Sequence, residues 1–228
     1  MPKLKRLLHN VFITNRVGLF LANLHFRLRF STSAHYWEKR YALNGNSGLG
    51  SYGKLAGYKA GIINEFIEKY NISSVIDFGC GDGNQLQQFK FPLYTGLEVS
   101  ATALEKCMDR HKNDPSKNFF LYDPKRNADY SAATTADLSL SLDVLYHLVE
   151  DDIFETYMHR LFSAASRFVI IYAWDVDGAK KRHVRHRKFT AWITHNIVGW
   201  KLQQVIENKA LPGACDFFIF EKSFSENC

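Results

Sequence analysis

The stretch that decides the fold of this 228-residue chain is Ser74-Val75-Ile76-Asp77-Phe78-Gly79-Cys80-Gly81-Asp82-Gly83-Asn84. A short, β-branched apolar run ends in Asp77, and a glycine then follows at every second position. The run predicts a buried parallel strand, and the glycines predict a sharp turn that lets bare backbone approach a ligand. Because residues 84–89 can open a helix, the stretch predicts a nucleotide-binding edge at the carboxyl end of a parallel sheet.

The glycine spacing distinguishes between kinds of nucleotide site. The dinucleotide pattern Gly-x-Gly-x-x-Gly fails because Asn84 stands in the last position counted from Gly79, and no Gly-Lys-Ser/Thr of a P-loop follows. The pattern that remains, Asp-x-Gly-x-Gly-x-Gly from Asp77 to Gly83, resembles the class I S-adenosylmethionine (SAM) dependent methyltransferases. The resemblance implies that the turn lies beneath SAM and that Asp77 helps to hold its methionine end. SAM has no phosphate, so the loop needs no lysine, and acids suit its ammonium and sulfonium groups.

Acidic residues end the next strand-like runs in the order that this resemblance requires. Glu98 lies 21 positions after Asp77, where a second strand should carry the acid that binds ribose hydroxyls. The third run ends at Asp123, where the family often contacts adenine. The fourth continues into Asp143, at the place of the family's segment beside the methyl group. Each acid alone could merely end a strand or cap a helix, but together they favour a cofactor site.

The loop before the first strand is the second distinctive segment. In residues 35–54, aromatic side chains precede a loop rich in Gly, Asn and Ser, which is similar to a subgroup found near glycosyltransferases in polysaccharide clusters. Such loops are rich in hydrogen-bonding groups, and the family commonly uses this element as a lid over SAM. An ordinary surface loop is the alternative. The implied cofactor-binding set is Asp77, Gly79, Cys80, Gly81, Gly83, Glu98, Val99, Tyr122, Asp123, Leu142 and Tyr52.

The alternation of strand-like and helix-like segments predicts the architecture. Strands are expected at 74–78, 93–98, 119–122, 136–142, 167–174, 200–207 and 215–221, and helices at 55–70, 101–111 (with Ser100 as N-cap), 151–165 and 189–198. This order specifies a parallel sheet covered on both faces. The last two strands are close enough to pair antiparallel. The expected fold class is α/β: a Rossmann-like seven-stranded, mostly parallel sheet with a reversed last strand and helices on both faces.

The net charge of +6 comes from the N-terminal region. Residues 1–40 hold eight Lys/Arg and one acid, Glu38, so the other 188 residues hold 21 bases against 22 acids. We therefore divide the chain into a basic amphipathic arm, 1–35, and a single methyltransferase-like domain, 36–228. An amphipathic helix in residues 1–30 would suit an anionic membrane surface. A transit peptide, or a helix packed on the domain, are the alternatives.

The remaining composition bears on location. No apolar stretch reaches the ~18 residues of a spanning helix, and no secretory signal is clear. The four cysteines, Cys80, Cys107, Cys215 and Cys228, match no zinc motif, so they are expected to be free thiols in a reducing compartment. We therefore expect a cytoplasmic protein, with peripheral contact to the inner face of a membrane as an open alternative. The oligomeric state is not indicated.

Methyl transfer to a hydroxyl requires a base, because an alcohol is a poor nucleophile until its proton is taken. His147 lies just beyond the fourth strand and is the first candidate, although it could equally make only local hydrogen bonds. His183 and His186 are the second candidates, and Asp143 completes the catalytic set. Asp143 and Asp175 end two strands, where some family members bind Mg²⁺. The run Leu-Asp-Val-Leu-Tyr-His resembles metal-independent members instead, so Mg²⁺ is not favoured and no metal ligand is assigned.

The acceptor is approached by elimination. DNA amino-methylating enzymes usually carry Asn/Asp-Pro-Pro-Tyr/Phe after the fourth strand, and cytosine C5 enzymes use Pro-Cys. This chain has neither, so no DNA partner is expected. Residues 180–188 are basic and form either a solvated loop or a rim for an anionic or polyhydroxylated acceptor. The subgroup resemblance implies O-methylation of a sugar, glycan or other small hydroxylated acceptor. The alternatives are an RNA or protein methyltransferase docked through the basic arm, and a non-catalytic SAM-binding partner module.

Overall fold

The computed structural model describes residues 31–125, 135–178, 183–209, 211 and 213–223. The chain divides into two compact units, 1–31 and 32–228, and the fold given below is that of the second unit. The predicted membrane-binding segment 1–30 lies outside the described residues. The first described helix begins at Ser33, inside the range assigned to the arm. Within the described chain we find no helix whose length and hydropathy would let it traverse a bilayer.

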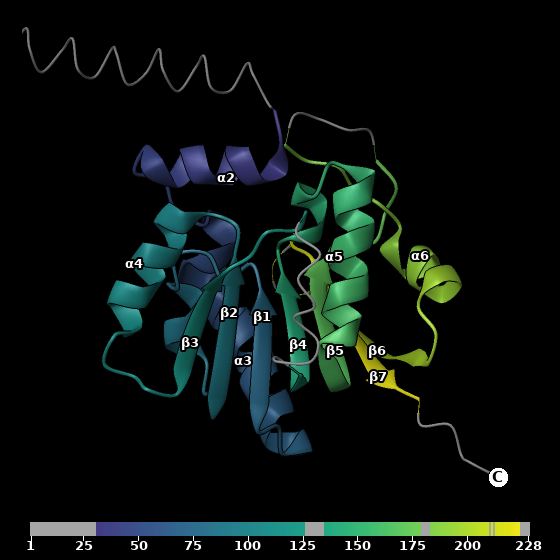
Figure 1. Ribbon diagram of the computed structural model, residues 1–228. Helices are drawn as coiled ribbons and strands as arrows, with labels where there is room; N and C mark the ends of the chain where they lie inside the picture. Colours follow the sequence, from purple (N-terminus) through teal and green to yellow (C-terminus); the bar gives the residue numbers. More distant parts are fainter. Residues whose placement is uncertain (1–30, 126–134, 179–182, 210, 212, 224–228) are drawn as a thin grey trace, which may run out of the picture. The chain divides into compact units, whose positions relative to one another are not determined.

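The described strands form one seven-stranded sheet with the order β3-β2-β1-β4-β5-β7-β6, as Figure 1 shows. All neighbours from β3 to β5 pair in parallel, and β7 runs antiparallel to both β5 and β6. The predicted fold class is therefore confirmed, including the reversed last strand. The strands are β1 (Ser74–Phe78), β2 (Leu93–Glu98), β3 (Lys117–Leu121), β4 (Ala136–Leu142), β5 (Ala165–Ala173), β6 (Trp200–Ile206) and β7 (Asp216–Lys222).

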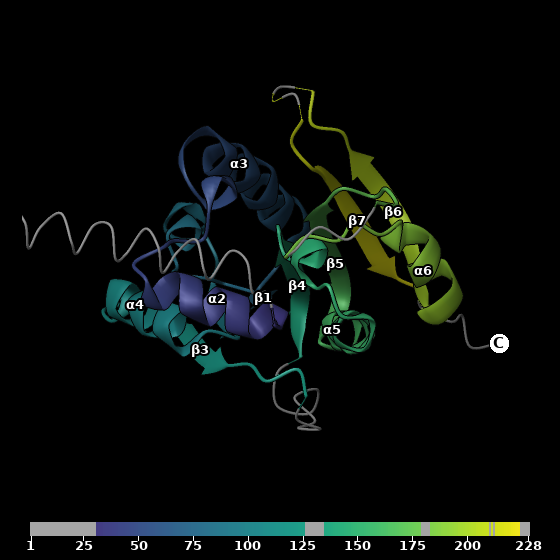
Figure 2. The ribbon, with the colours of Figure 1, turned by 90° about the horizontal axis from the view of Figure 1, so that it is seen from above.

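The helices cover both faces of the sheet. They are α2 (Ser33–Ala42), α3 (Gly53–Tyr70), α4 (Ala101–His111), α5 (Asp151–Ser163) and α6 (Phe189–Asn196), with short 3₁₀ turns η1 (Leu49–Ser51), η2 (Gln85–Gln88) and η3 (Leu145–His147). Seen from above, α3 lies on one side of the sheet and α5 on the other (Figure 2). Successive residues of β1 enter different cores: Val75 packs in the cluster with α3, and Ile76 in the cluster with α5 and α6. This alternation follows from the two-residue period of a strand.

One predicted helix is corrected by the structure. Residues 84–89 were expected to open a helix, but they form only the 3₁₀ turn η2, which ends at Gln88. Pro92 follows closely, and a proline lacks the N–H of a helical bond and holds the residue before it in an extended conformation. The predicted N-cap of α4 is confirmed, because the Ser100 hydroxyl accepts a hydrogen bond from the backbone N–H of Ala103 at 3.1 Å. Cys80, Cys107 and Cys215 are free thiols.

Candidate active site

The glycine turn after β1 is shaped by both conformation and close packing. Gly79 and Gly81 have φ of 97° and 60°, in the left-handed region that side chains with a Cβ rarely adopt. A Cβ on Gly79 would lie 2.6 Å from Cγ2 of Val144, and one on Gly81 would lie 2.5 Å from Oγ of Ser47. Glycine is therefore required at both positions, since the chain turns there against two other segments.

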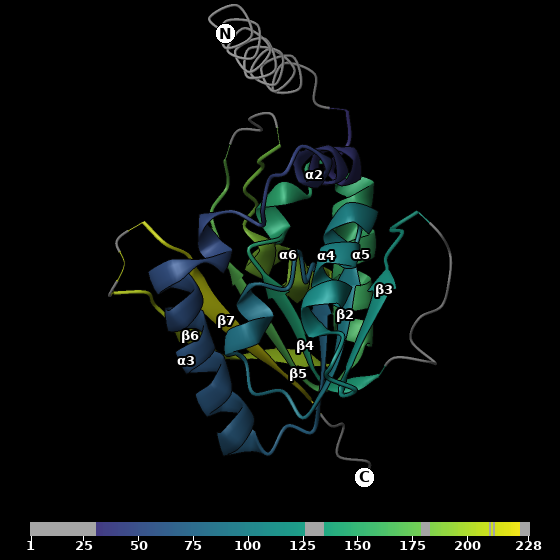
Figure 3. The same cartoon turned by 90° about the vertical axis from the view of Figure 1, so that its left-hand side faces the viewer.

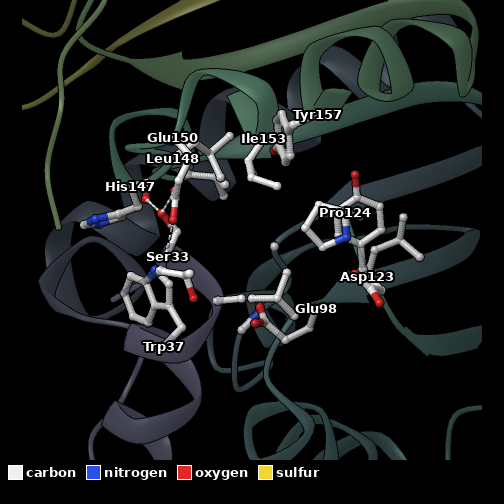
Figure 4. A pocket seen from close by; sticks show the side chains of 18 of the residues that line it. Ser33, Trp37, Glu98, Asp123, Pro124, His147, Leu148, Glu150, Ile153 and Tyr157 are labelled. Atoms are coloured by element: carbon white, nitrogen blue, oxygen red, sulfur yellow. Dashed lines mark hydrogen bonds between the residues drawn. The ribbon is translucent and has the colours of Figure 1, made fainter. Parts of the chain in front are cut away.

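A cavity of about 340 Å³ opens at the carboxyl ends of the strands, beside this turn. Its wall includes most of the residues expected from the sequence: Gly79, Gly81, Glu98, Val99, Tyr122, Asp123, Leu142, Asp143 and His147. Helix α2 lies across this edge of the sheet (Figures 1 and 3). In Figure 4, Trp37 and Ser33 of α2 stand at one end of the cavity and Asp123 and Pro124 at the other. A cavity of this size suits a small-molecule ligand.

Asp77, Cys80, Gly83, Tyr52 and His183 do not line this cavity. Asp77 is buried at the end of β1, with 6% of its surface exposed. The hydroxyl of Tyr94 donates to its Oδ2 at 2.9 Å, whereas Oδ1 has no hydrogen-bond partner among the described residues. Burial raises the pKa of Asp77 to about 6, although the Tyr94 hydrogen bond and the charge of Lys59 act in the opposite direction. A buried acceptor oxygen without a donor is costly unless a ligand satisfies it.

Glu98 connects the end of β2 to the glycine turn. Its Oε2 accepts from the backbone N–H of Gly81 at 3.0 Å, and its Oε1 accepts from that of Ser100 at 2.9 Å. The side chain is 6% exposed, and burial raises its pKa to about 7 in spite of these hydrogen bonds. Figure 4 shows Glu98 on the cavity wall, on the side that leads to Asp123. Glu98 and Asp123, the acids that follow β2 and β3, therefore both line one cavity of the size of a small ligand.

The loop between α2 and α3 is fastened to the glycine turn through Asp82. The Tyr52 hydroxyl donates to Oδ2 of Asp82 at 2.6 Å, and the Asp82 N–H donates to Oγ of Ser47 at 3.1 Å. Asn84 adds a bond from its side-chain amide to the carbonyl of Ser51 at 2.8 Å. Burial alone would raise the pKa of Asp82, but hydrogen bonds led by that from Tyr52 outweigh it and lower the pKa. Tyr52 thus contacts the glycine turn through Asp82.

Sequence reasoning missed Asp82 and the contribution of α2. Ser33 anchors the start of α2, since its N–H and its hydroxyl donate to the two carboxylate oxygens of Glu150 at 2.9 and 2.6 Å. Glu38 anchors the same helix to the start of α4, where it accepts from the hydroxyl of Thr102 at 2.5 Å. The signal that could have located this helix is Thr32, whose hydroxyl caps it by accepting from the His35 N–H.

Two of the candidate histidines, His147 and His183, stack on each other near the α2 end of the cavity. The Nδ1 of His147 lies 3.0 Å from the carbonyl oxygen of His183, so Nδ1 carries the proton and Nε2 is left as an acceptor. Burial lowers the pKa of His147 to about 4. Its ring extends away from Glu98 and Asp123 in Figure 4. The His183 ring stacks on Tyr36 at 4.0 Å, and His186 packs on Trp174 at 5.2 Å, both outside the cavity wall.

Asp143 lines the cavity but its carboxylate is already paired. The Nζ of Lys59 lies 2.5 Å from its Oδ2, and the hydroxyl of Tyr146 donates to its Oδ1 at 2.9 Å. Asp175, the other acid considered for Mg²⁺, accepts from the backbone and hydroxyl of Thr190. Among the described residues, no three His, Cys, Asp or Glu side chains come together in a way that could hold a metal ion.

Part of the basic segment 180–188 is used inside the fold. Arg185 and Arg187 both pair with Asp151, at 2.8 and 3.0 Å, and Arg187 also donates to the carbonyl of Leu148 at 2.6 Å. These two guanidinium groups therefore brace the start of α5. Residues 179–182 lie outside the described chain, so the rim predicted for an acceptor is described only in part.

Comparison with solved structures identifies the fold. The N-methyltransferase NodS from Bradyrhizobium japonicum, solved with S-adenosylhomocysteine (SAH), superimposes with a TM-score of 0.63 at 14% identity, over 84% of this chain and 99% of that one. Magnesium protoporphyrin IX methyltransferase from Synechocystis, solved with SAM, gives 0.59 at 16% identity, over 85% and 98%. An amino pentose methyltransferase from Micromonospora echinaspora, also solved with SAM, gives 0.59 at 14% identity, over 76% and 94%.

These likenesses establish the class of fold and nothing finer. The chain has the Rossmann-like fold of SAM-dependent methyltransferases. No protein-family model matches the chain, and no curated protein matches it significantly.

Proposed function

We propose that this protein is a SAM-dependent methyltransferase that methylates a hydroxyl group of a sugar, glycan or other small acceptor. The observation that carries the proposal is the cavity beside the glycine turn, on whose wall Glu98 and Asp123 stand together. The residues fit the cofactor. On the cavity wall, Glu98 offers carboxylate oxygens to hydroxyls, and Asp77, which does not line the cavity, adds a buried carboxylate beside the glycine turn that favours a cationic ligand. Among the described residues, the cavity wall carries one lysine, Lys125, and no arginine, so it offers little positive charge to a phosphate.

The residues divide into a cofactor end and an acceptor end. Gly79, Gly81 and Glu98 would hold the cofactor, which supplies an electrophilic methyl group on its sulfonium sulfur. Trp37 offers an aromatic surface at the other end, against which the apolar face of a sugar ring packs well. The amino pentose methyltransferase with the same fold acts on a sugar, which supports this acceptor class. His147 lines the same end of the cavity, and its Nε2 would take the hydroxyl proton once the ring turns inward from its orientation in Figure 4.

Calorimetry followed by a transfer assay tests the proposal. Purified protein should release or absorb heat with both SAM and SAH, and methyl-labelled SAM should label a glycan or small-molecule fraction. Label in RNA or protein would mean that the acceptor is RNA or protein, as in the alternative proposal. Binding of SAM without any methyl transfer would indicate a non-catalytic module. Absence of heat with both ligands would refute the assignment.

The proposed base has its own test. His147→Gln should lower turnover by about 100-fold or more while SAH affinity stays unchanged, because a general base typically contributes 10²–10⁴. His195→Gln is the matched control, since among the described residues its ring bonds to the carbonyl of Ala191 within α6 and does not line the cavity. Equal turnover of the two variants would remove His147 from the mechanism.

Cofactor affinity should depend on pH. Burial raises the pKa of Glu98 to about 7 and that of Asp77 to about 6, so both become anionic as the pH rises from 5.5 to 8. SAM carries a net positive charge, so its affinity should increase over this range by about tenfold or more. The folded state holds these protons more tightly than the unfolded state. The ligand-free protein should therefore lose stability over the same range. Calorimetry and thermal unfolding across the pH range measure both trends, and pH-independent SAM affinity would contradict the prediction.

A further inference from the structure

Helix α3 buries a lysine in its apolar face. Lys59 is completely inaccessible to solvent and lies among the core residues of α3, next to Ala60 and one turn before Ile63. Burying an ammonium group is costly unless it is paired. Its partner is Asp143, whose Oδ2 is 2.5 Å from Nζ. The side chain of Asp143 is 17% exposed and lines the cavity, so the pair is closed to solvent at the lysine but not at the carboxylate.

Asp143 occupies an unusual backbone conformation at the end of β4. Its φ of 62° is in the left-handed region, which costs a residue other than glycine roughly 1 kcal/mol or more. Its backbone N–H donates to the carbonyl of Tyr172 at 3.0 Å, and its Oδ1 accepts from Tyr146. The chain therefore turns sharply here, and the next residue, Val144, is directed against Gly79 of the glycine turn.

The same carboxylate contacts the loop between α2 and α3. A Cβ on Gly50 would lie only 2.4 Å from Oδ2 of Asp143, so the Gly50 backbone rests against the carboxylate. The next residue, Ser51, accepts the hydrogen bond from Asn84 beyond the glycine turn. The loop 49–51 thus contacts the Asp143 carboxylate, while Val144 and Ser51 on either side of that contact reach the glycine turn and its continuation.

We propose that Lys59 is a positioning residue, whose ammonium group holds Asp143 where the loop 49–51, the segment 143–147 and the glycine turn close together around the ligand. The inference rests on the proposed function only for the identity of that ligand. Lys59 itself does not line the cavity, so it acts through Asp143.

The groups around the pair keep their protonation near neutral pH. Tyr146 contacts Asp143 from η3, the Sγ of Cys215 lies 3.8 Å from its Oδ1, and the ring of Tyr172 on β5 lies 5.2 Å from Nζ. Burial raises the pKa of each of these three groups above its usual value, so all three stay neutral. Asp77 on β1 also feels the charge of Lys59, and its own titration is seen in the wild type. Because the Lys59→Met/Asp143→Asn variant keeps any change at Asp77, its comparison with Lys59→Met isolates the contribution of Asp143.

Lys59→Met tests the inference because it keeps the length of the side chain and removes the charge. An unpaired buried carboxylate holds a proton more tightly than a paired one. SAH affinity should be about tenfold weaker than in the wild type at both pH 6 and pH 8.5, because the ammonium group that holds Asp143 is missing at both. The deficit in unfolding midpoint without ligand should grow with pH, because only the folded state holds the extra proton.

Two further variants make the result decisive. Lys59→Met/Asp143→Asn should remove the part of the pH dependence that comes from Asp143, whereas Ile63→Ala, a loss of buried volume on the same helix, should lower the unfolding midpoint equally at both pH values and leave SAH affinity unchanged. If Lys59→Met does not fold, Asp143→Asn alone should give the mirror image. It leaves the lysine unpaired, so its deficit in unfolding midpoint should shrink as the pH rises.

The outcomes separate the inference from the proposed function. A Lys59→Met protein that binds SAH like wild type, or whose losses match those of Ile63→Ala at both pH values, overturns the inference. Wild-type protein that binds neither SAM nor SAH overturns the proposed function instead, and the unfolding measurements still test the pair.

Discussion

Glu98→Gln is expected to weaken SAM and SAH binding by about 10- to 100-fold, since a hydrogen bond to a charged group contributes ~1.5–3 kcal/mol. The substitution preserves shape but places an NH₂ group where a carboxylate oxygen now accepts from Gly81 or Ser100. Two donors would then face each other in a buried site. The variant also loses its titratable carboxyl, so the increase of cofactor affinity with pH should become shallower. Calorimetry at pH 6 and 8 measures both effects.

The matched control for this change is Glu65→Gln. It is the same substitution on an exposed position of α3, away from the cavity. It should leave cofactor affinity and its pH dependence as in the wild type. If Glu98→Gln binds SAH as tightly as Glu65→Gln does, Glu98 is not a cofactor contact and serves only to tie β2 to the glycine turn.

Gly81→Ala is expected to destabilise the protein by about 1–3 kcal/mol and to weaken SAH binding by about tenfold or more. The φ of 60° at this position is strained for alanine, and the added Cβ would lie 2.5 Å from Oγ of Ser47 and 3.0 Å from the hydroxyl of Tyr41. The loop must move away from the glycine turn to make room. Both residues line the cavity, so the displacement should reach the ligand.

Gly61→Ala is the matched control, and its expected effect on stability has the opposite sign. Gly61 lies in the middle of α3, is exposed, and has no atom within 4 Å of the position that a Cβ would take. Alanine there should stabilise the fold by about 0.5–1 kcal/mol, because glycine loses more backbone entropy in a helix. Urea unfolding of both variants, with SAH calorimetry, measures the difference. Equal stability of the two would mean that the glycine turn tolerates a side chain.

The sheet was predictable because its information is local. The apolar run 74–78, its glycines and the acids at the ends of later runs lie within short stretches of chain, and the strand pattern specified the seven-stranded sheet with its reversed last strand. The turn η2 was not predicted correctly, because its helix-like composition is ended by Pro92 beyond the motif. Composition within a window indicates a tendency, but the residues that follow decide how far it extends.

In the site, too, some residues could be predicted from local sequence and others could not. Glu98 and Asp123 could be named from sequence, because parallel strands bring their carboxyl ends to one edge wherever they lie in the chain. Lys59 could not, since its neighbours in α3 predict an ordinary core-facing helix, and the anion that justifies burying it is 84 positions away.

By itself, then, the sequence determined the order of strands and helices and the glycine turn that lines the cavity. Only the tertiary structure decided that α2 lines the cavity, that Asp82 is hydrogen-bonded to the loop between α2 and α3, and that Asp143 is paired with a buried lysine. The reason is physical. Backbone periodicity depends on near neighbours, whereas the state of a polar side chain depends on which distant groups exclude water from it.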